Sequence, residues 1–274
     1  MRNLYRLVLF PFVLTALVIS AAGNPPRAVE VSSDAVLTQE LKDELSQDLK
    51  FHNVTVSVDT RIATLEGSVE DYRDKLAAEY VAREHRRIEG IRDFITVVPI
   101  VEIADRELQT KLGERLQYEG IDHGSGFNNL QLAVKEGIVT VSGQVRSYPD
   151  KASALAIVED AAGVRDVKDE IRVLPVSPLD DDLRFQTAKA IYGDSVLRKY
   201  ILAPQGPIHI VVEDGHVKLY GIVDNTADKH IAELRAREVS GIFSVENNLA
   251  VANSCEQKLA DSGPSVNGNG SNPR

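Results

Sequence analysis

One short pattern occurs three times along the chain, and it limits the possible folds more than any other feature of the sequence. Each copy reads apolar, polar, apolar, any residue, glycine, any residue, valine, and the central glycines are Gly67, Gly143 and Gly221. From these glycines the three stretches align without a gap as far as Val97, Val173 and Val251. Self-similarity of this kind is typical of tandem structural units, so we expect three copies of one small module.

Apolar and polar residues alternate on both sides of a short turn before each of these glycines, which predicts a β-hairpin with one buried face. In copy three, a two-residue turn at Asp214-Gly215 places Val212 opposite Val217 on that face. The residues of this turn favour the positive φ that such hairpins need. The corresponding turns are Glu136-Gly137 in copy two and Thr60-Arg61, a weaker turn sequence, in copy one.

A helix is predicted directly after each repeated pattern, with apolar residues at helical spacing on one face. Its predicted N-caps are Asp71, Ser147 and Asn225. An aspartate follows each cap three residues later, at the positive end of the helix. Gly163 and Gly241 predict the helix ends in copies two and three, because a C′ glycine takes the left-handed conformation. Copy one has Arg87 at this position, so its helix should end differently.

A shorter helix at the start and a strand at the end complete each copy. The first helix has leucines at i, i+4 and i+8 in copies one and two and a weaker match in copy three. The last strand, reached by a right-handed crossover, should lie parallel to the second. The predicted fold class is α+β, with three tandem αββαβ modules, each packing two helices on one face of a three-stranded mixed sheet. The predicted modules span 34–101, 104–176 and 180–253.

The two ends of the chain differ from the repeats. Residues 1–23 combine two arginines, an apolar run and the small residues Ser20-Ala21-Ala22, which is typical of a cleaved secretory signal peptide. An uncleaved membrane anchor is the alternative, but the apolar run 7–19 spans only roughly 20 Å as a helix, short of the ~30 Å hydrocarbon core. The mature chain should therefore have no transmembrane span. Residues 254–274 hold Gly, Ser, Asn and Pro without pattern and are predicted to be a disordered tail.

These features together resemble the BON domain, named for bacterial OsmY and nodulation proteins. Its signature is an alternating hairpin that ends in apolar-x-Gly-x-Val, then a helix ending in Gly-Val, then Val, Asn and Leu. Copy three is the clearest match, at residues 212–221, 241–242 and 245–249. Copy two matches nearly as well, whereas copy one departs at Arg61 and Arg87.

The resemblance implies a periplasmic or cell-envelope protein with no enzymatic activity and no catalytic residues. Members of the family are associated with phospholipid binding, envelope integrity, osmotic or stress response, and chaperone-like help to outer-membrane proteins. We therefore expect a non-catalytic protein that binds phospholipid headgroups or other envelope components. The alternative is a soluble periplasmic stress-response chaperone for outer-membrane protein clients. An enzyme is least favoured, because no nucleophile–base pair or metal-ligand cluster recurs in the copies.

Charge and cysteine content restrict the function classes further. The formal net charge of −10 argues against a nucleic-acid-binding protein, which needs a clustered excess of Lys and Arg. It also weakens any mechanism in which bulk charge draws the protein to an anionic membrane. The single cysteine, Cys255, makes no intramolecular disulfide and no cysteine-based zinc site. No metal or other cofactor is predicted.

Two surfaces are candidates for interaction. A dense basic cluster at the predicted end of the second helix of copy one consists of Arg83, Arg86 and Arg87. It could contact a headgroup or partner, or simply complement the helix dipole. The outer sheet face of copy three carries Val211, Tyr220 and Ile222. Because an exposed apolar patch needs a reason, we expect this face to dock on another repeat, with a partner or a membrane as alternatives.

Three other patterns have ordinary structural explanations. The hairpin pairing places His209 opposite Tyr220 and well along the strand from His216, which argues against a metal site. Residues 123–126 read His-Gly-Ser-Gly but lack the Gly-x-Ser-x-Gly elbow of a serine nucleophile, so a loop is predicted. The run Asp180-Asp181-Asp182 opens a helix, where carboxylates favour the dipole rather than a bound cation.

Overall fold

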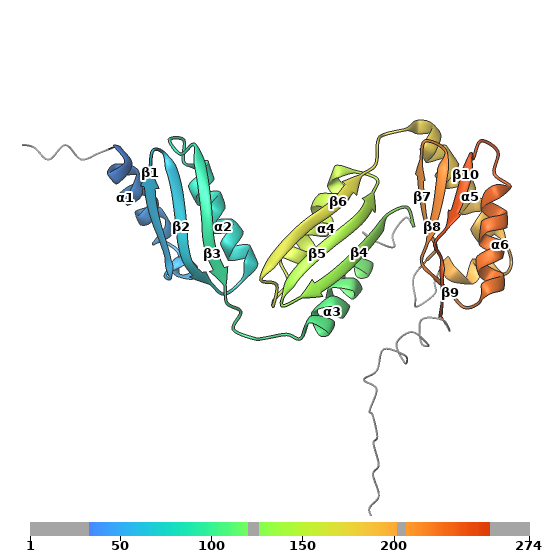
Figure 1. Cartoon of the computed structure of the whole chain (residues 1–274), viewed down its shortest axis with the longest axis horizontal. Coiled ribbons are helices and arrows are strands. Elements are labelled where there is room, and N and C mark those ends of the chain that lie inside the picture. Colours follow the sequence, from blue (N-terminus) through green and yellow to red (C-terminus); the bar gives the residue numbers. More distant parts are fainter. Residues whose placement is uncertain (1–32, 120–125, 202–206, 253–274) are drawn as a thin grey trace, which may run out of the picture.

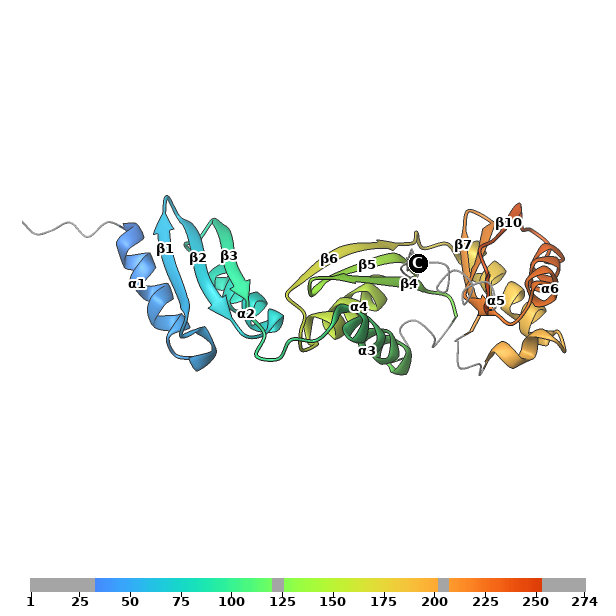
Figure 2. The same cartoon turned by 60° about the horizontal axis from the view of Figure 1, so that its bottom comes forward.

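Three similar modules follow one another along the longest axis of the molecule in the computed structural model (Figure 1). The structure describes residues 33–119, 126–201 and 207–252. The predicted signal peptide at 1–23 and the predicted tail at 254–274 lie outside these residues. The predicted fold class is confirmed, because each module packs helices against one face of a mixed sheet, as Figure 2 shows clearly for the middle module.

Modules 1 and 2 have the same order of α-helices and strands, and module 1 adds one short 3-10 helix. Module 1 consists of α1 (Ser33–Leu45), the short 3-10 helix η1 (Leu49–Phe51), β1 (Val54–Asp59), β2 (Ile62–Val69), α2 (Tyr72–Glu84) and β3 (Gly90–Val97). Module 2 consists of α3 (Asp105–Tyr118), β4 (Asn129–Lys135), β5 (Ile138–Val145), α4 (Tyr148–Glu159) and β6 (Asp166–Val173). In both, the second helix connects two neighbouring parallel strands.

Module 3 keeps this order but divides its second and third strands into two pieces each. It consists of α5 (Pro178–Gly193), the 3-10 helix η2 (Leu197–Ile201), β7 (His209–Glu213), β8 (His216–Tyr220), β9 (Ile222–Val223), α6 (Thr226–Arg237), β10 (Ser244–Asn247) and β11 (Ala250–Val251). Strand β10 pairs with β8, and β11 pairs with β9, so the divided strands still run side by side.

Each module has its own sheet, with the hairpin antiparallel and the last strand parallel to the second. The order is β1-β2-β3 in module 1, β4-β5-β6 in module 2 and β7-β8-β10 in module 3. The predicted hairpin register is confirmed, because Val212 lies opposite Val217. The inward positions of the central strands are 0% exposed, as predicted: Leu65, Val141 and Leu219. Each sheet therefore covers a core instead of joining a single continuous sheet.

The repeated glycine marks the point where the second strand passes closest to the first. Gly143 has a φ of 117°, and a Cβ at this residue would lie 2.0 Å from the carbonyl oxygen of Asn129. Any other residue would require the backbone to move. Gly67 and Gly221 have nearly the same φ, 118° and 119°. The same kink therefore recurs in all modules, and in module 3 it separates β8 from β9.

All three hairpin turns take the left-handed conformation, including the one with the weaker turn sequence. Thr60 and Arg61 have φ values of 50° and 63°, close to the 56° and 76° of Glu136 and Gly137. A positive φ is a genuine outlier for a β-branched residue such as threonine. We infer that the pairing of the flanking strands holds this turn in place, rather than the preference of its own residues.

The predicted helix ends are wrong in detail. Helix α4 ends at Glu159 and α6 at Arg237, so Gly163 and Gly241 do not occupy the C′ position. The residue after each helix stays in the right-handed region, and its backbone N–H still bonds a carbonyl of the last helical turn. The two glycines have φ values of 88° and 92° and belong to the turn that follows.

Buried apolar residues form two clusters, one across modules 1 and 2 and one in module 3. Tyr72, at the start of α2, is 8% exposed and belongs to the first cluster. Phe127 precedes β4 and so belongs to module 2 in sequence, yet it is buried in the cluster of module 3. The modules are thus separate sheets whose cores meet at the junctions.

Candidate interaction surfaces

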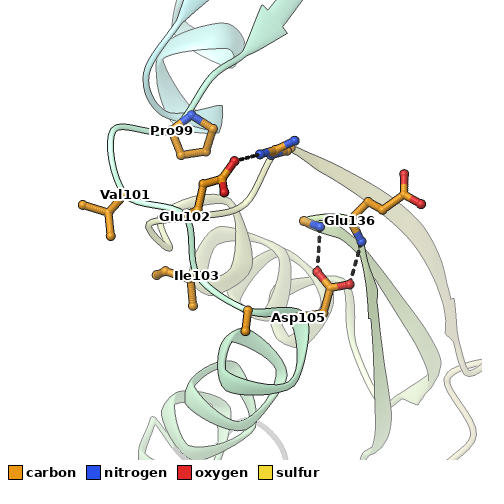
Figure 3. A pocket seen from close by; sticks show the side chains of 10 residues that line it. Pro99, Val101, Glu102, Ile103, Asp105 and Glu136 are labelled. Atoms are coloured by element: carbon orange, nitrogen blue, oxygen red, sulfur yellow. Dashed lines mark hydrogen bonds and ion pairs between the residues drawn. The ribbon is translucent and has the colours of Figure 1, made fainter.

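An aspartate at the start of the first helix holds the hairpin turn of its module. In module 2, Asp105 accepts hydrogen bonds from the backbone N–H groups of Glu136 and Gly137, at 2.7 and 2.9 Å (Figure 3). Beside this turn, Glu102 of the linker pairs with Arg165 at 3.2 Å, across a cavity of about 330 Å³. Glu102 and Asp105, two of the carboxylates that line this cavity, already have partners.

The same contact recurs in the other two modules. Asp180 is 3% exposed and accepts the two backbone N–H groups of the Asp214-Gly215 turn, at 3.1 and 2.9 Å. In module 1, Asp34 accepts a single N–H, that of Thr60, at 2.9 Å. The acidic start of α5 therefore has a structural role that helix-dipole reasoning alone did not identify. Its first carboxylate is directed at a turn and is not free for a cation.

The turn contacts of Asp105 and Asp180 lower the pKa of their carboxyl groups. For Asp105, the hydrogen bonds from its turn lower the pKa of the carboxyl below the usual value. For Asp180, burial by itself would raise the pKa, but the hydrogen bonds from its turn and from Ser177, together with the charge of Arg184, outweigh burial and the pKa is lowered. Both groups are therefore ionised at neutral pH and unsuited to act as general acids.

A lysine from the second helix satisfies the outer edge of the last strand in each module. In module 2, Lys151 donates to the carbonyl oxygen of Ile171 at 2.9 Å and pairs with Asp169 at 2.6 Å. Asp169 accepts the backbone N–H of Ile171 at 3.0 Å. The equivalent sets are Lys75, Asp93 and Ile95 in module 1, and Lys229, Asn247 and Leu249 in module 3. Such contacts protect a sheet edge from pairing with another strand.

The opposite edge of each sheet is held by the first helix. The pairs are Thr38 with the N–H of Val58 at 3.0 Å, Gln109 with the carbonyl of Leu132 at 2.8 Å, and Arg184 with the carbonyl of Val212 at 2.5 Å. Together with the lysine contacts, these bonds give each of the two outer strands of every module one side-chain partner from a helix. We call these contacts the edge clamps. They favour the faces of the modules over the edges as sites for partners.

The predicted basic cluster of module 1 is partly neutralised by neighbouring acids. Arg83 pairs with Glu79 on the same helix, and Arg87 pairs with Glu40 of α1. Because α2 ends at Glu84, Arg86 and Arg87 follow the helix and do not form its last turn. Arg86 is exposed and has no ion pair within the part of the chain that the structure describes. The cluster therefore offers one uncompensated cation on this surface.

The outer sheet face predicted for copy three meets module 2. Val211 is only 2% exposed. Next to it, Arg172 of β6 forms two hydrogen bonds with the carboxylate of Glu213, at 2.5 and 2.7 Å. A cavity of about 270 Å³ remains between the modules, lined by Gln144, Arg172, Val211, Glu213, Asp214, His216 and Lys218. Tyr220 is partly exposed, and Ile222 is 37% exposed. The three predicted residues thus differ in their surroundings, and only Val211 is fully covered.

Among the described residues, the histidines that were candidates for metal binding do not come together in a site. His209 lies opposite Tyr220, and the Nδ1 of the exposed His216 is 2.7 Å from the hydroxyl of Ser244. Within the described residues, no group of three or more His, Cys, Asp or Glu side chains is placed to hold a metal ion. Residues 123–125 lie outside the described part. Across the ranges that the structure covers, no helix combines the length and apolar character needed to cross a bilayer.

Sequence reasoning missed an exposed apolar surface where module 1 meets its linker. Phe94 is 62% exposed, Val98 57%, Ile100 79% and Val101 65%. We call these four residues the apolar strip. The signal that could have revealed it is the apolar run on both sides of Pro99, in a segment predicted only as a linker. The strip continues from the outer face of β3 into the chain that leads to module 2.

The fold defines a tandem α+β protein in which each small module has its own sheet, with both outer strands bonded to helix side chains. Three segments, 33–99, 104–175 and 194–253, match the BON domain family and together cover more than half of the chain. The chain therefore belongs to the BON domain family. The third match begins at residue 194, so helix α5, which carries Asp180 and Arg184, lies outside it.

Two further proteins are similar to this chain. The osmotically-inducible protein Y of Escherichia coli (strain K12) is 29% identical over 139 residues, which make up 47% of this chain and 65% of that relative. The C-terminal domain of CdsD, a structural protein of the type III secretion system of Chlamydia trachomatis, is 14% identical. That match covers 78% of this chain and 96% of the other, with a TM-score of 0.22.

Proposed function

We propose that this chain is a non-catalytic binding protein of the cell envelope, exported to the periplasm by a signal peptide at residues 1–23, and that it associates with phospholipid through the apolar strip. The basic start, apolar run and small residues of 1–23 support export. The name of the Escherichia coli relative supports a role in the response to osmotic stress. Membership of the BON domain family supports binding rather than catalysis.

The apolar strip is the observation that carries this proposal. Each of its four side chains exposes more than half of its surface. Four large apolar side chains that are exposed within eight residues of chain suggest a surface that binds something. Complete burial of a valine, isoleucine or phenylalanine side chain contributes about 1.5–3 kcal/mol. Partial insertion of the strip between headgroups is therefore enough to hold the protein at a bilayer surface.

The charge of the protein indicates how this association should respond to salt. The net charge is −10, and both Arg83 and Arg87 are paired with acids. Long-range attraction to anionic lipid therefore contributes little, and Arg86 supplies at most a local headgroup contact. Binding driven by apolar insertion should persist at high ionic strength, whereas binding driven by charge weakens as salt screens it.

Vesicle flotation tests the proposal directly. The mature chain is mixed with neutral and with anionic phospholipid vesicles at low and at high salt. We expect it to float with both, and we expect the double variant Phe94→Ser, Ile100→Ser to lose most of the floating fraction. Val176→Ser is the matched control, because Val176 is a 92% exposed linker valine outside the strip. Equal flotation of the double variant and the parent, or no flotation of the parent, would refute the lipid assignment.

The chaperone alternative predicts a different result with the same proteins. A client-binding chaperone would use the strip on an unfolded outer-membrane protein and would not need a bilayer. The parent should then suppress aggregation of such a client at amounts where it does not float with vesicles. Loss of that suppression in the double variant, with the Val176→Ser control unaffected, would favour the chaperone over the lipid-binding protein.

A further inference from the structure

Two oppositely charged side chains lie next to the apolar strip on the outer face of the module 1 sheet. Phe94 of β3 lies opposite Glu66 of β2, and Arg92, two residues before Phe94, lies opposite Thr64. Residues two apart on one strand point to the same side of a sheet, so all four share the outer face. Glu66, Arg92 and Phe94 are exposed. A negative charge, a positive charge and an aromatic ring are therefore neighbours on one surface.

Within the part of the chain that the structure describes, neither of these charges has an ion pair or a side-chain hydrogen bond. The Cα atoms of Glu66 and Arg92 are roughly 8 Å apart, from the spacing of neighbouring strands and the rise of two residues. By contrast, Asp93 on the opposite face of β3 pairs with Lys75 at 3.4 Å. Both charges beside the strip are thus available to a ligand from outside the module.

The rest of this face is flat and consists mostly of short hydroxyl side chains. They are Thr55, Ser57, Thr64, Ser68 and Thr96. On the three strands, Asp59 is the other charged residue that points outward, and it lies at the far end of β1, opposite Ile62. Strand β2 separates it from β3. A bulky headgroup can therefore approach Glu66 and Arg92 without obstruction by long side chains.

We propose that Arg92 and Glu66 bind the zwitterionic headgroup of a phospholipid, with Arg92 on the phosphate and Glu66 on the ammonium group, while Phe94 reaches the acyl boundary. This inference rests on the proposed function, because it names the headgroup that the lipid-binding surface selects. A guanidinium matches phosphate oxygens with two parallel N–H bonds, and a carboxylate attracts the ammonium. Two neighbouring opposite charges on the protein thus complement the two opposite charges that one headgroup carries.

An anionic headgroup fits this surface less well. Phosphatidylglycerol offers a phosphate to Arg92 but no cation to Glu66. The carboxylate of Glu66 would then lose hydration at the interface without gaining a partner. The net charge of −10 adds repulsion from an anionic surface. The protein should therefore prefer a zwitterionic bilayer, and Glu66 should contribute to that preference.

Module 2 provides matched controls for both charges. Lys168 and Glu170 are exposed at the positions equivalent to Arg92 and Phe94. An acid stands there in place of the aromatic ring, so this face has charges but no apolar anchor beside them. Lys168→Gln and Glu170→Gln change the net charge by the same amounts as Arg92→Gln and Glu66→Gln. Effects that arise only from net charge are therefore equal within each pair of variants.

Partition of the full mature chain into vesicles tests the headgroup. Phosphatidylcholine and phosphatidylglycerol vesicles with the same acyl chains are titrated with the parent and the four single variants at physiological ionic strength. We expect Arg92→Gln to weaken partition into both lipids by about twofold to fivefold, since both carry a phosphate. We expect Glu66→Gln to weaken partition into phosphatidylcholine by a similar factor and to strengthen partition into phosphatidylglycerol. Partition of Lys168→Gln and Glu170→Gln into phosphatidylcholine should equal that of the parent.

The sign of the Glu66→Gln effect is the sharpest part of this test. Removal of a charge ordinarily makes insertion at a neutral bilayer easier, because less hydration is lost. Unchanged or stronger partition of Glu66→Gln into phosphatidylcholine would therefore overturn the ammonium contact. Equal behaviour of Arg92→Gln and Lys168→Gln would overturn the phosphate contact. Lower thermal midpoints for Arg92→Gln and Glu66→Gln with unchanged partition would assign the two charges to an ion pair with each other.

Failure of this inference is distinguishable from failure of the proposed function. If the parent binds vesicles and Phe94→Ser, Ile100→Ser does not, the lipid-binding surface stands even when Glu66→Gln and Arg92→Gln have no effect. A parent that binds neither lipid overturns the proposed function and the headgroup site together.

Discussion

Modules 1 and 2 present equivalent outer faces at the end of their last strand, but only one of them is covered. Val98 and Leu174 lie at the same distance after the repeated glycine, yet Val98 is 57% exposed and Leu174 only 3%. Two residues earlier, module 2 has Arg172, which grips Glu213 of module 3, where module 1 has Thr96. The same face is thus buried in module 2 and open in module 1, and the two modules differ there in a few residues.

Truncating the two equivalent apolar residues, Leu174 and Val98, should give the largest difference in stability between the two modules. Leu174→Ala removes a buried side chain and should lower the free energy of unfolding by about 2–5 kcal/mol. Val98→Ala changes an exposed side chain and should stay within about 0.5 kcal/mol of the parent. Urea unfolding of the full mature chain, followed by circular dichroism, measures both. Similar effects at the two positions would contradict the difference in burial between Leu174 and Val98.

Removing the turn carboxylates should lower the free energy of unfolding by different amounts in modules 1 and 3, and by less than the core truncation does. Asp180→Asn places an amide against backbone N–H groups in a buried site and should cost about 1–3 kcal/mol. Asp34→Asn affects one exposed contact, so its loss should be clearly smaller. Urea unfolding of the two variants compares them. A larger loss for Asp34→Asn than for Asp180→Asn would contradict the ranking of these contacts.

The lowered pKa of Asp180 adds a test by pH. Its folded pKa lies below the unfolded value of about 3.9. The stability it contributes is therefore fully present above that unfolded value and is lost as the pH falls through the folded pKa. The Asp180→Asn variant should consequently show a shallower loss of stability in acid than the parent. Parallel acid titrations of the two proteins would not be expected if Asp180 makes this contribution.

Breaking the ion pair between modules 2 and 3 should have the smallest effect. The Arg172 side chain is 49% exposed, so Arg172→Ala should cost only about 0.2–1 kcal/mol, and less at high salt. Thr96→Ala, at the equivalent position of module 1, should have no measurable effect. The double variant Arg172→Glu, Glu213→Arg should regain part of the loss. If the thermal midpoint of the double variant is no higher than that of Arg172→Ala, the ion pair does not stabilise the junction.

The repeating part of the structure was predictable from the sequence because inward side chains recur with fixed spacing. The register of Val212 and Val217 followed from alternation and a two-residue turn, and both are fully buried. The spacing of apolar residues indicates the type of secondary structure and which face of it is buried. The fold class, the parallel last strand and the module order depend on these properties alone.

Contacts between distant segments were not predictable in the same way. Asp180 reaches a turn that lies far along the chain, and no local pattern links the two. Phe127 stands in a loop without periodicity, so nothing in the sequence indicates that its ring enters the next module. The exposure of Val98 and Ile100 depends on how the linker leaves module 1. The predicted outer-face residues Val211 and Ile222 differ in exposure, and no local pattern in the sequence indicates which of them is covered.

The edge clamps have a consequence for how a protein of this kind arises. Similar sequences placed in tandem can mispair while they fold, because a strand of one copy can insert beside the matching strand of the next. Lys75, Lys151 and Lys229 each reach a backbone carbonyl within their own copy, so a finished unit leaves fewer unpaired groups for its neighbour. Duplication of the unit can therefore lengthen the chain with little risk of entanglement between copies.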